Sequence, residues 1–228
     1  MSKWAAIIPT RGQQRKVFTG WAVHRAVQNG YDHVYLIDYN PVDNLVDMYK
    51  RISVGVEQAI KDGCEFVSII EDDDWYSIDY LKTLKKLPPT WDIVGINHST
   101  YYHLFSTGWK KMVHPGRAGL FCTSFRPEIL DKLPDTKTAF LDLGWWRIAN
   151  NNPKISTKLI DTDLALGIKH GVGISGGNGH SMAYQTFDTR LQKLQSTVDK
   201  EAFRFYEKLR EDLIQTWKYA NNKRKGVP

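Results

Sequence analysis

Short apolar runs alternate with segments of helical periodicity in the N-terminal part of the chain. The runs at Trp4–Ile8, His33–Asp38 and Phe66–Ile70 are apolar and rich in β-branched residues, which predicts three buried strands. Between them, Val17–Asn29 and Asn44–Lys61 place apolar residues three and four positions apart, which predicts two helices. Each helix stops at an Asn-Gly or Asp-Gly pair, as a helix C-terminus commonly does. Strands that alternate with helices predict a parallel, right-handed, doubly wound α/β sheet.

The pattern is less regular beyond the third strand, and it predicts shorter elements. In chain order we expect a helix at Ser77–Leu87, a strand at Asp92–Asn97, a hairpin-like insertion at Ser99–Ser124, a short helix near Lys137–Asn150, a strand at Ser156–Ile160, a glycine-rich loop at Gly167–Gly179 and a long amphipathic helix at Val198–Tyr219. No repeat or credible interdomain linker interrupts this order, so we expect one domain.

Composition narrows the class of protein. A hydrophobic content of 42% and a charged content of 25% exclude a mainly disordered chain. A net charge of +6 favours an anionic partner such as a nucleotide-sugar, a nucleic acid or an acidic membrane surface. Cys64 and Cys122 lack a pairing or metal-ligand pattern, and no apolar run reaches membrane-spanning length. These features predict a cytoplasmic protein that does not insert into a membrane.

Four consecutive acidic residues, Glu71 to Asp74, follow the third predicted strand. The carboxyl ends of parallel strands meet at one edge of the sheet, which is where such sheets bind ligands. The four carboxylates repel one another unless a cation or basic side chains offset their charge. Oxygen ligands suit Mg²⁺ or Mn²⁺, whereas no arrangement of Cys or His suits structural zinc. The run therefore predicts a divalent-metal site, and an exposed acidic turn is the alternative.

Several motifs together resemble a known family. The segment Ile69–Trp75 looks like the Asp-X-Asp segment of nucleotide-sugar-dependent glycosyltransferases with the GT-A fold, particularly the inverting family 2. Ile7–Arg11 resembles the first strand and nucleotide-binding turn of that family, and Asp38 matches its acidic residue for the nucleobase or ribose. Phe140–Asp142, followed by Trp145–Arg147, resembles the segment that carries the catalytic base.

The resemblance implies a GT-A, Rossmann-like fold: a mostly parallel central sheet flanked by helices, with a C-terminal amphipathic helix. It divides the single domain 1–228 into a nucleotide-sugar-binding half at 1–97, an acceptor-binding and catalytic half at 98–195, and a C-terminal helix and basic tail at 196–228. The implied reaction moves a sugar from a nucleotide-diphosphate donor to an acceptor hydroxyl with inversion, and it uses Mn²⁺ or Mg²⁺.

The resemblance also assigns roles to residues. It implies Asp142 as general base, Trp145 and Trp146 at the acceptor, and a donor site of Pro9, Thr10, Arg11, Asp38, Asp72, Asp73 and Lys169. The implied metal ligands are Asp73, Asp74 and His180, with His170 as a second choice for the histidine. Apart from the resemblance, the charge of Arg190 makes it a further candidate partner for the diphosphate. The sequence has Glu71 where the family often has Asp, and Leu141 where it has a second acid. The direct ligand is Asp73 in one register of the motif and Asp74 in the other.

Each assignment has a structural alternative. Asp142 is also the acidic residue that favours the N-terminus of a helix, and the two tryptophans are equally consistent with a core plug. His180 is also consistent with an ordinary surface histidine, and Lys169 and Arg190 with solvated charges.

Two other functions compete with glycosyl transfer. Nucleotidyl transfer also uses carboxylates at strand ends, but the loop at residues 9–15 holds a single glycine instead of a glycine-rich segment. The positive charge and the many aromatic residues also suit a non-catalytic nucleic-acid-binding protein. The two ideas merge if the acceptor is a nucleic-acid base, which makes the acceptor either a glycan or DNA.

Overall fold

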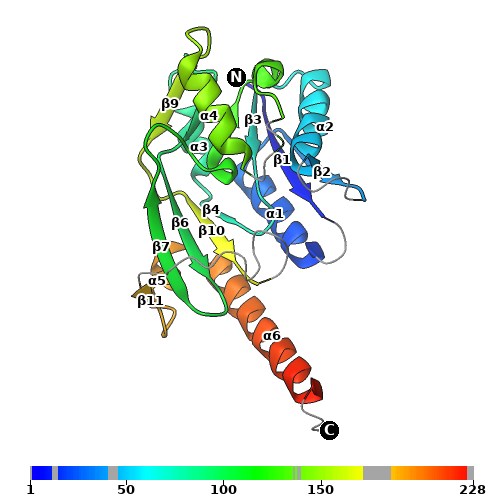
Figure 1. The fold of residues 1–228 in the computed structure, drawn as a ribbon, viewed down its shortest axis with the longest axis vertical. Coiled ribbons are helices and arrows are strands. Elements are labelled where there is room, and N and C mark those ends of the chain that lie inside the picture. Colours follow the sequence, from blue (N-terminus) through cyan, green and yellow to red (C-terminus); the bar gives the residue numbers. More distant parts are fainter. Residues whose placement is uncertain are drawn as a thin grey trace. The chain divides into compact units, whose positions relative to one another are not determined.

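The computed structural model describes residues 2–11, 15–40, 46–135, 137, 140–171 and 186–224, with side chains up to residue 217 (Figure 1). The chain forms two compact units. The first unit comprises Met1–Ser99 and Met112–Ala165, and the second comprises Thr100–Lys111 and Leu166–Pro228. No helix among the described residues is both long enough and apolar enough to cross a lipid bilayer.

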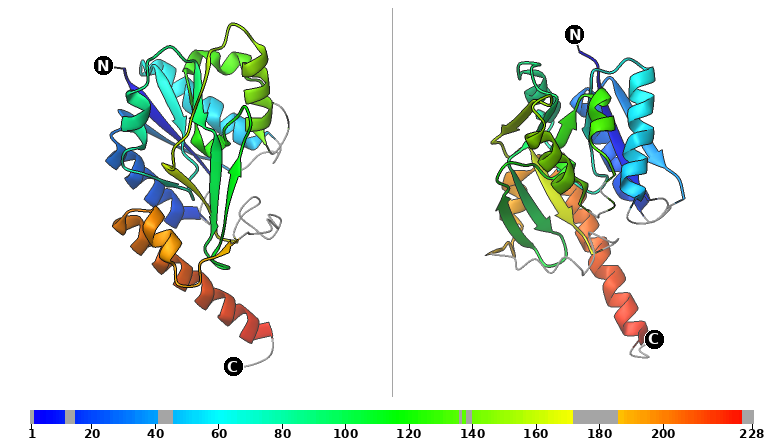
Figure 2. Two further views of the ribbon diagram at one scale, coloured as in Figure 1. Left: turned by 90° about the vertical axis from the view of Figure 1, so that its left-hand side faces the viewer. Right: turned by 45° about the horizontal axis from the view of Figure 1, so that its top comes forward.

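The first unit is an α/β structure built on a six-stranded sheet. The strands of this sheet follow the order β2-β1-β3-β8-β5-β9. Figures 1 and 2 show helices packed beside the N-terminal strands. In chain order the elements of the unit are β1 (Trp4–Thr10), α1 (Lys16–Asn29), β2 (His33–Asp38), α2 (Asp47–Lys61), β3 (Phe66–Ile69), β4 (Trp75–Tyr76), α3 (Tyr80–Lys85), β5 (Ile93–Ile96), η2 (Leu120–Cys122), β8 (Thr123–Phe125), η3 (Pro127–Lys132), α4 (Leu141–Asn151) and β9 (Thr157–Ile160).

The sheet is mostly parallel, as the sequence predicts. β1 pairs in parallel with both β2 and β3, and β5 pairs in parallel with β9. The exception is β8, a three-residue strand that runs antiparallel to its neighbours β3 and β5. The sequence pattern does not predict β8, because a run this short has no detectable periodicity.

Helices α1 and α2 cover opposite faces of the sheet. Gly55 in α2 lies so close to Ile7 that a Cβ at Gly55 would come within 2.5 Å of the Ile7 side chain. On the other face, the Thr10 and Thr19 hydroxyls lie 2.9 Å apart, which places α1 there. Residues 7 and 10 of one strand point to opposite faces, since side chains alternate along a strand. This is the arrangement of a doubly wound sheet.

In the second unit, β11 (Thr186–Phe187), β7 (Gly108–Val113), β6 (His98–His103) and β10 (Ala165–Lys169) are successive neighbours in a second sheet. Strands β6 and β7 are adjacent and follow each other in the chain, which confirms the predicted hairpin. Helices α5 (Gln192–Thr197) and α6 (Lys200–Arg224) complete the unit. The sequence predicts α6 but not α5.

The prediction of a glycine-rich loop is wrong at its beginning. Residues 165–169 form β10, which pairs with β6 in the register Gly167 to Tyr101. A Cβ at Gly167 would lie 2.4 Å from the ring of Tyr101, so the glycine serves close packing across the two strands instead of loop mobility. The rest of that predicted loop, from residue 172, lies outside the described residues.

Close packing of β5 gives a stability test in the first unit. A Cβ at Gly95 would lie 2.3 Å from the Cβ of Ala118 and 2.9 Å from the Cys122 carbonyl oxygen. We predict that Gly95→Ala lowers the free energy of unfolding by about 1–3 kcal/mol, because the backbone at this contact has to move. Urea denaturation measures the change. Gly20→Ala is the control: a Cβ at Gly20 in α1 meets nothing within 4 Å, and the substitution is expected to stabilise by about 0.5–1 kcal/mol. Equal effects of the two substitutions would contradict the packing of β5.

Candidate functional site

The carboxyl ends of β1, β2 and β3 meet at one edge of the six-stranded sheet. Thr10 at the end of β1 is the register partner of Asp38 at the end of β2, and Ile7 is the partner of Ile69 in β3. The Ile70 N–H extends this ladder by donating to the Ile7 carbonyl at 2.9 Å. The polar segments after the three strands are therefore neighbours at this edge, as predicted.

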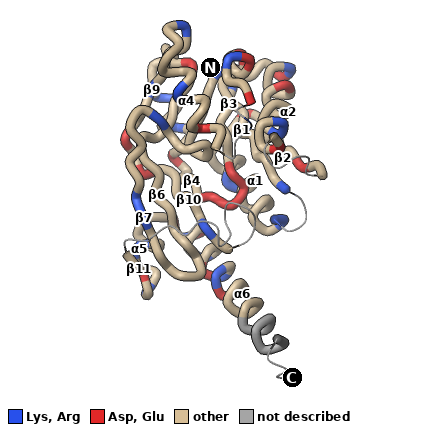
Figure 3. Tube along the Cα trace, viewed as in Figure 1, with Lys and Arg blue, Asp and Glu red and all other residues tan. Residues whose placement is uncertain are grey.

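The acidic run lies at this edge and gathers three of its carboxylates into one cluster. Glu71, Asp73 and Asp74 each offer an oxygen atom, and the three atoms lie within 4.8 Å of one another. Asp73 and Asp74 are buried, and Glu71 is half-buried. The run is visible as a continuous acidic stretch of the chain in Figure 3. An all-oxygen set of this kind fits Mg²⁺, Mn²⁺ or another hard divalent cation.

Asp72 does not belong to this cluster; its carboxylate contacts Thr10 at the end of β1 and Arg15. Its Oδ2 accepts a hydrogen bond of 2.6 Å from the Thr10 hydroxyl, and its Oδ1 lies 2.9 Å from Nη2 of Arg15. Asp72 thus ties the acidic run to the end of β1 and to the residue that precedes α1. Both of the alternative direct ligands, Asp73 and Asp74, belong to the cluster of three carboxylates.

Arg15 supplies a positive charge to the acidic run. Its Nη2 forms ion pairs with both Asp72 and Asp73. Burial is the largest influence on the pKa of Arg15 and lowers it, but the carboxylates of Asp73, Asp72, Glu71 and Asp74 together outweigh burial and raise this pKa above its ordinary value. The guanidinium therefore stays charged and offsets part of the repulsion within the run. The sequence predicts that a cation or basic side chains offset the charge of the acidic run, but it does not identify Arg15 as the partner.

Tyr76 links the acidic run to η2. The Glu71 N–H donates to the Tyr76 hydroxyl at 2.9 Å, and this hydroxyl donates to the Phe121 carbonyl at 2.8 Å. Burial raises the pKa of the adjacent Cys122 thiol to about 12, and the charges of Asp74 and Asp142 add to the rise.

Asp142 lies in the first turn of α4 and is largely buried. Burial raises its pKa above the ordinary value for Asp. The Arg117 guanidinium, with Nη1 2.6 Å from Asp142 Oδ2, opposes that rise but does not cancel it. Asp142 is therefore a largely buried carboxylate with a raised pKa and a guanidinium partner, features that are common among functional carboxylates. The sequence does not identify Arg117 as the partner of Asp142.

The two tryptophans assigned to the acceptor are core residues in this structure. Trp145 and Trp146 are 0% and 1% exposed. The Trp145 indole N–H donates to the Pro134 carbonyl, and the Trp146 indole N–H donates to the Thr123 hydroxyl. This burial favours the core plug, the alternative that the sequence leaves open.

Several other assigned residues do not belong to the first unit. Lys169 and His170 are buried in the second unit, where the Lys169 ammonium lies 5.1 Å from the centre of the Tyr101 ring, and Arg190 is exposed there. His180 lies outside the described residues. Pro9, Thr10 and Arg11 belong to the first unit together with Asp38, which is exposed at the end of β2.

Comparison with known proteins gives likeness in fold only. No family model matches the sequence, and no curated protein matches it. Three solved structures resemble the chain: S. aureus TarS 1-349 in complex with UDP-GlcNAc (13% identity over 75% of this chain and 60% of that chain, TM-score 0.49), the catalytic domain of Drosophila β1,4-galactosyltransferase 7 in complex with xylobiose (14%, 86% and 79%, TM-score 0.46) and A197 from STIV (18%, 71% and 82%, TM-score 0.44). With TM-scores below 0.5, these likenesses carry no argument about function, which rests on the site itself.

The position of Arg15 predicts competition with a metal ion. We expect Arg15→Gln to lower the free energy of unfolding by about 1–3 kcal/mol without metal, because two buried carboxylates lose a charged partner. Saturating Mn²⁺ should raise the thermal unfolding midpoint of this variant more than that of the unchanged protein, since the ion then supplies the missing charge. Lys16→Gln, an equal charge change at the exposed neighbouring residue, is the control. The same Mn²⁺ response in all three proteins would contradict competition between Arg15 and a metal ion.

Proposed function

We propose that this chain is a glycosyltransferase with a GT-A fold that moves a sugar from a nucleoside-diphosphate donor to an acceptor hydroxyl. The observation that carries the proposal is the cluster of Glu71, Asp73 and Asp74 at the carboxyl edge of a parallel sheet. An open α/β sheet binds its ligands at this edge, and a carboxylate cluster there binds a diphosphate only through a cation. The proposed metal is Mn²⁺ or Mg²⁺, which neutralises the charge that develops on the departing diphosphate.

The proposed donor site uses the ends of the first two strands. Asp38 is exposed beside the end of β1 and is suited to accept hydrogen bonds from a ribose or nucleobase. Arg11 directly follows β1 and supplies positive charge for the phosphates. Thr10 orients the acidic run through its hydrogen bond to Asp72, so its proposed contribution to donor binding is indirect.

The proposed reaction is a single displacement in which Asp142 is the general base. The acceptor oxygen forms a bond to the anomeric carbon while the bond from that carbon to the diphosphate oxygen breaks. The hydroxyl proton passes to Asp142, and the nucleoside diphosphate leaves with the bonding electron pair. Attack from the face opposite the leaving group inverts the anomeric configuration. Arg117 fixes the direction of the Asp142 carboxylate through its contact with Oδ2.

A donor panel tests this function. Incubation with UDP-, GDP-, CDP- and ADP-sugars should release nucleoside diphosphate from at least one donor, slowly to water and faster with a suitable acceptor. Chelation by EDTA should abolish release, and added Mn²⁺ or Mg²⁺ should restore it. Neither binding nor release with any donor would refute glycosyl transfer. Pyrophosphate release from nucleoside triphosphates would instead indicate nucleotidyl transfer, and salt-dependent binding to DNA without turnover would indicate a nucleic-acid-binding protein.

The role of Asp142 predicts a specific kinetic defect. Asp142→Asn should lower kcat by about 10²–10⁴-fold and leave the donor Kd nearly unchanged, because a base acts on the acceptor proton and not on the donor. Asp131→Asn, at an exposed carboxylate, is the control. An equal loss of donor binding and turnover would contradict the role of a base.

The pH profile gives a second readout of the same residue. Asp142 acts as a base only when it is deprotonated, so kcat should fall as the pH decreases through its pKa. Because burial raises that pKa, the acidic limb should lie above the ordinary range for an aspartate. The limb should move still higher in Arg117→Ala, since the guanidinium that lowers the pKa of Asp142 is then missing.

A further inference from the structure

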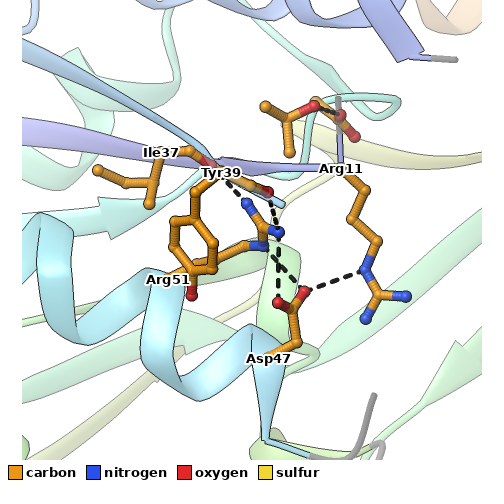
Figure 4. A network of polar contacts seen from close by, with 7 residues as sticks. Arg11, Ile37, Tyr39, Asp47 and Arg51 are labelled. Atoms are coloured by element: carbon orange, nitrogen blue, oxygen red, sulfur yellow. Dashed lines mark hydrogen bonds and ion pairs between the residues drawn. The ribbon is translucent and has the colours of Figure 1, made fainter. Parts of the chain in front are cut away.

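A buried carboxylate at the start of α2 binds two guanidinium groups near the proposed donor site. Asp47 is 0% exposed. Its Oδ2 lies 2.9 Å from Nε of Arg51 and 3.2 Å from Nε of Arg11, and its Oδ1 lies 3.2 Å from Nη2 of Arg51 (Figure 4). We call these three residues the Asp47 cluster.

The Asp47 cluster carries more positive than negative charge. Its three side chains comprise one carboxylate and two guanidinium groups, and both guanidinium groups contact that carboxylate. A fully buried carboxylate is costly unless it is paired, and the bidentate contact with Arg51 already provides a good partner.

Arg51 holds the backbone on both sides of Asp38. Its Nη1 donates to the Ile37 carbonyl at 3.1 Å, and its Nη2 donates to the Tyr39 carbonyl at 2.8 Å. The guanidinium also stacks on the Tyr39 ring, with 4.0 Å between the guanidinium carbon and the ring centre (Figure 4). Because the carbonyl groups on both sides of Asp38 are held by Arg51, the backbone of Asp38 has a fixed position. Its side chain is exposed.

Arg11 is held differently from Arg51. Its Nε faces Asp47, while its two terminal nitrogen atoms point away from Asp47 (Figure 4). The side chain is 26% exposed, whereas that of Arg51 is 1% exposed. Asp47 thus fixes the orientation of a guanidinium that is still accessible to solvent, which lowers the entropy that Arg11 loses when it binds an anion.

We infer that Asp47 is a positioning residue that fixes both ends of the nucleoside-diphosphate site. It holds Arg11 for the phosphates directly, and it holds Asp38 for the nucleoside through Arg51. This inference rests on the proposed function, because it assigns Arg11 and Asp38 to a donor. The buried side chains of Asp47 and Arg51 do not touch the donor, but they determine how tightly Arg11 and Asp38 bind it.

Two ligands distinguish the phosphate end of the site, at Arg11, from the nucleoside end, at Asp38. Calorimetry in the presence of MnCl₂ measures the binding of nucleoside diphosphates (UDP, GDP, CDP and ADP) and of inorganic pyrophosphate, which lacks the nucleoside. Asp38→Ala should weaken nucleoside diphosphate about tenfold and leave pyrophosphate unchanged. Arg11→Lys keeps the charge but loses the Nε contact, and it should weaken both probes. Asp47→Asn should weaken both probes about tenfold or more. Asp62→Asn, at the exposed end of α2, is the control and should change neither.

A double-mutant cycle distinguishes positioning from loss of stability. If Asp47 acts on phosphates through Arg11, then adding Asp47→Asn to Arg11→Lys should weaken pyrophosphate by much less than the product of the two single effects. Unfolding midpoints identify a variant that fails to fold, and Arg11→Lys alone still tests the inference in that case, because the substituted side chain is partly exposed. Unchanged affinities in folded Asp47→Asn, or in Arg11→Lys, would overturn the inference and leave the proposed function intact. Failure of the unchanged protein to bind any nucleotide would overturn both.

Discussion

Repulsion among four consecutive carboxylates is the constraint around which the site is built. Arg15 offsets part of this repulsion, because its guanidinium contacts Asp72 and Asp73 and keeps its charge. The hydrogen bond from Thr10 to Asp72 and the one from the Glu71 N–H to the Tyr76 hydroxyl then fix the run at the sheet edge. The oxygen atoms of Glu71, Asp73 and Asp74 are thereby held close together, which is the basis for the metal site that we propose.

Charge compensation by arginine recurs in the first unit. Arg117 faces Asp142, and Arg51 with Arg11 faces Asp47. In each case a buried or largely buried carboxylate is paired with a guanidinium, whose fixed geometry orients the carboxylate as well as stabilising it. The first unit therefore combines an apolar sheet with a few strongly oriented charged groups.

The sequence predicts the parts of the fold that have strong periodicity. The first three strands and two helices are confirmed, because apolar runs between glycine stops have few alternative interpretations. The pattern fails at β8 and β10: the first is three residues long, and the second contains a glycine that fits under Tyr101. The acidic run could be found from four adjacent residues. Its partner Arg15 and the contact of Arg11 with Asp47 could not, since only the fold brings these residues together. The assigned roles in the reaction stay predictions.

A crystal soaked with MnCl₂ and a nucleoside diphosphate gives the most direct test of the central claim. Anomalous scattering locates manganese independently of any assumption about ligands. The account predicts a peak within about 2.0–2.3 Å of carboxylate oxygen atoms of Glu71, Asp73 or Asp74, with diphosphate oxygen atoms completing the coordination and the Arg15 guanidinium moved away from Asp73. Manganese bound elsewhere, or an acidic run that keeps Arg15 on both Asp72 and Asp73 at saturating metal and nucleotide, would contradict it.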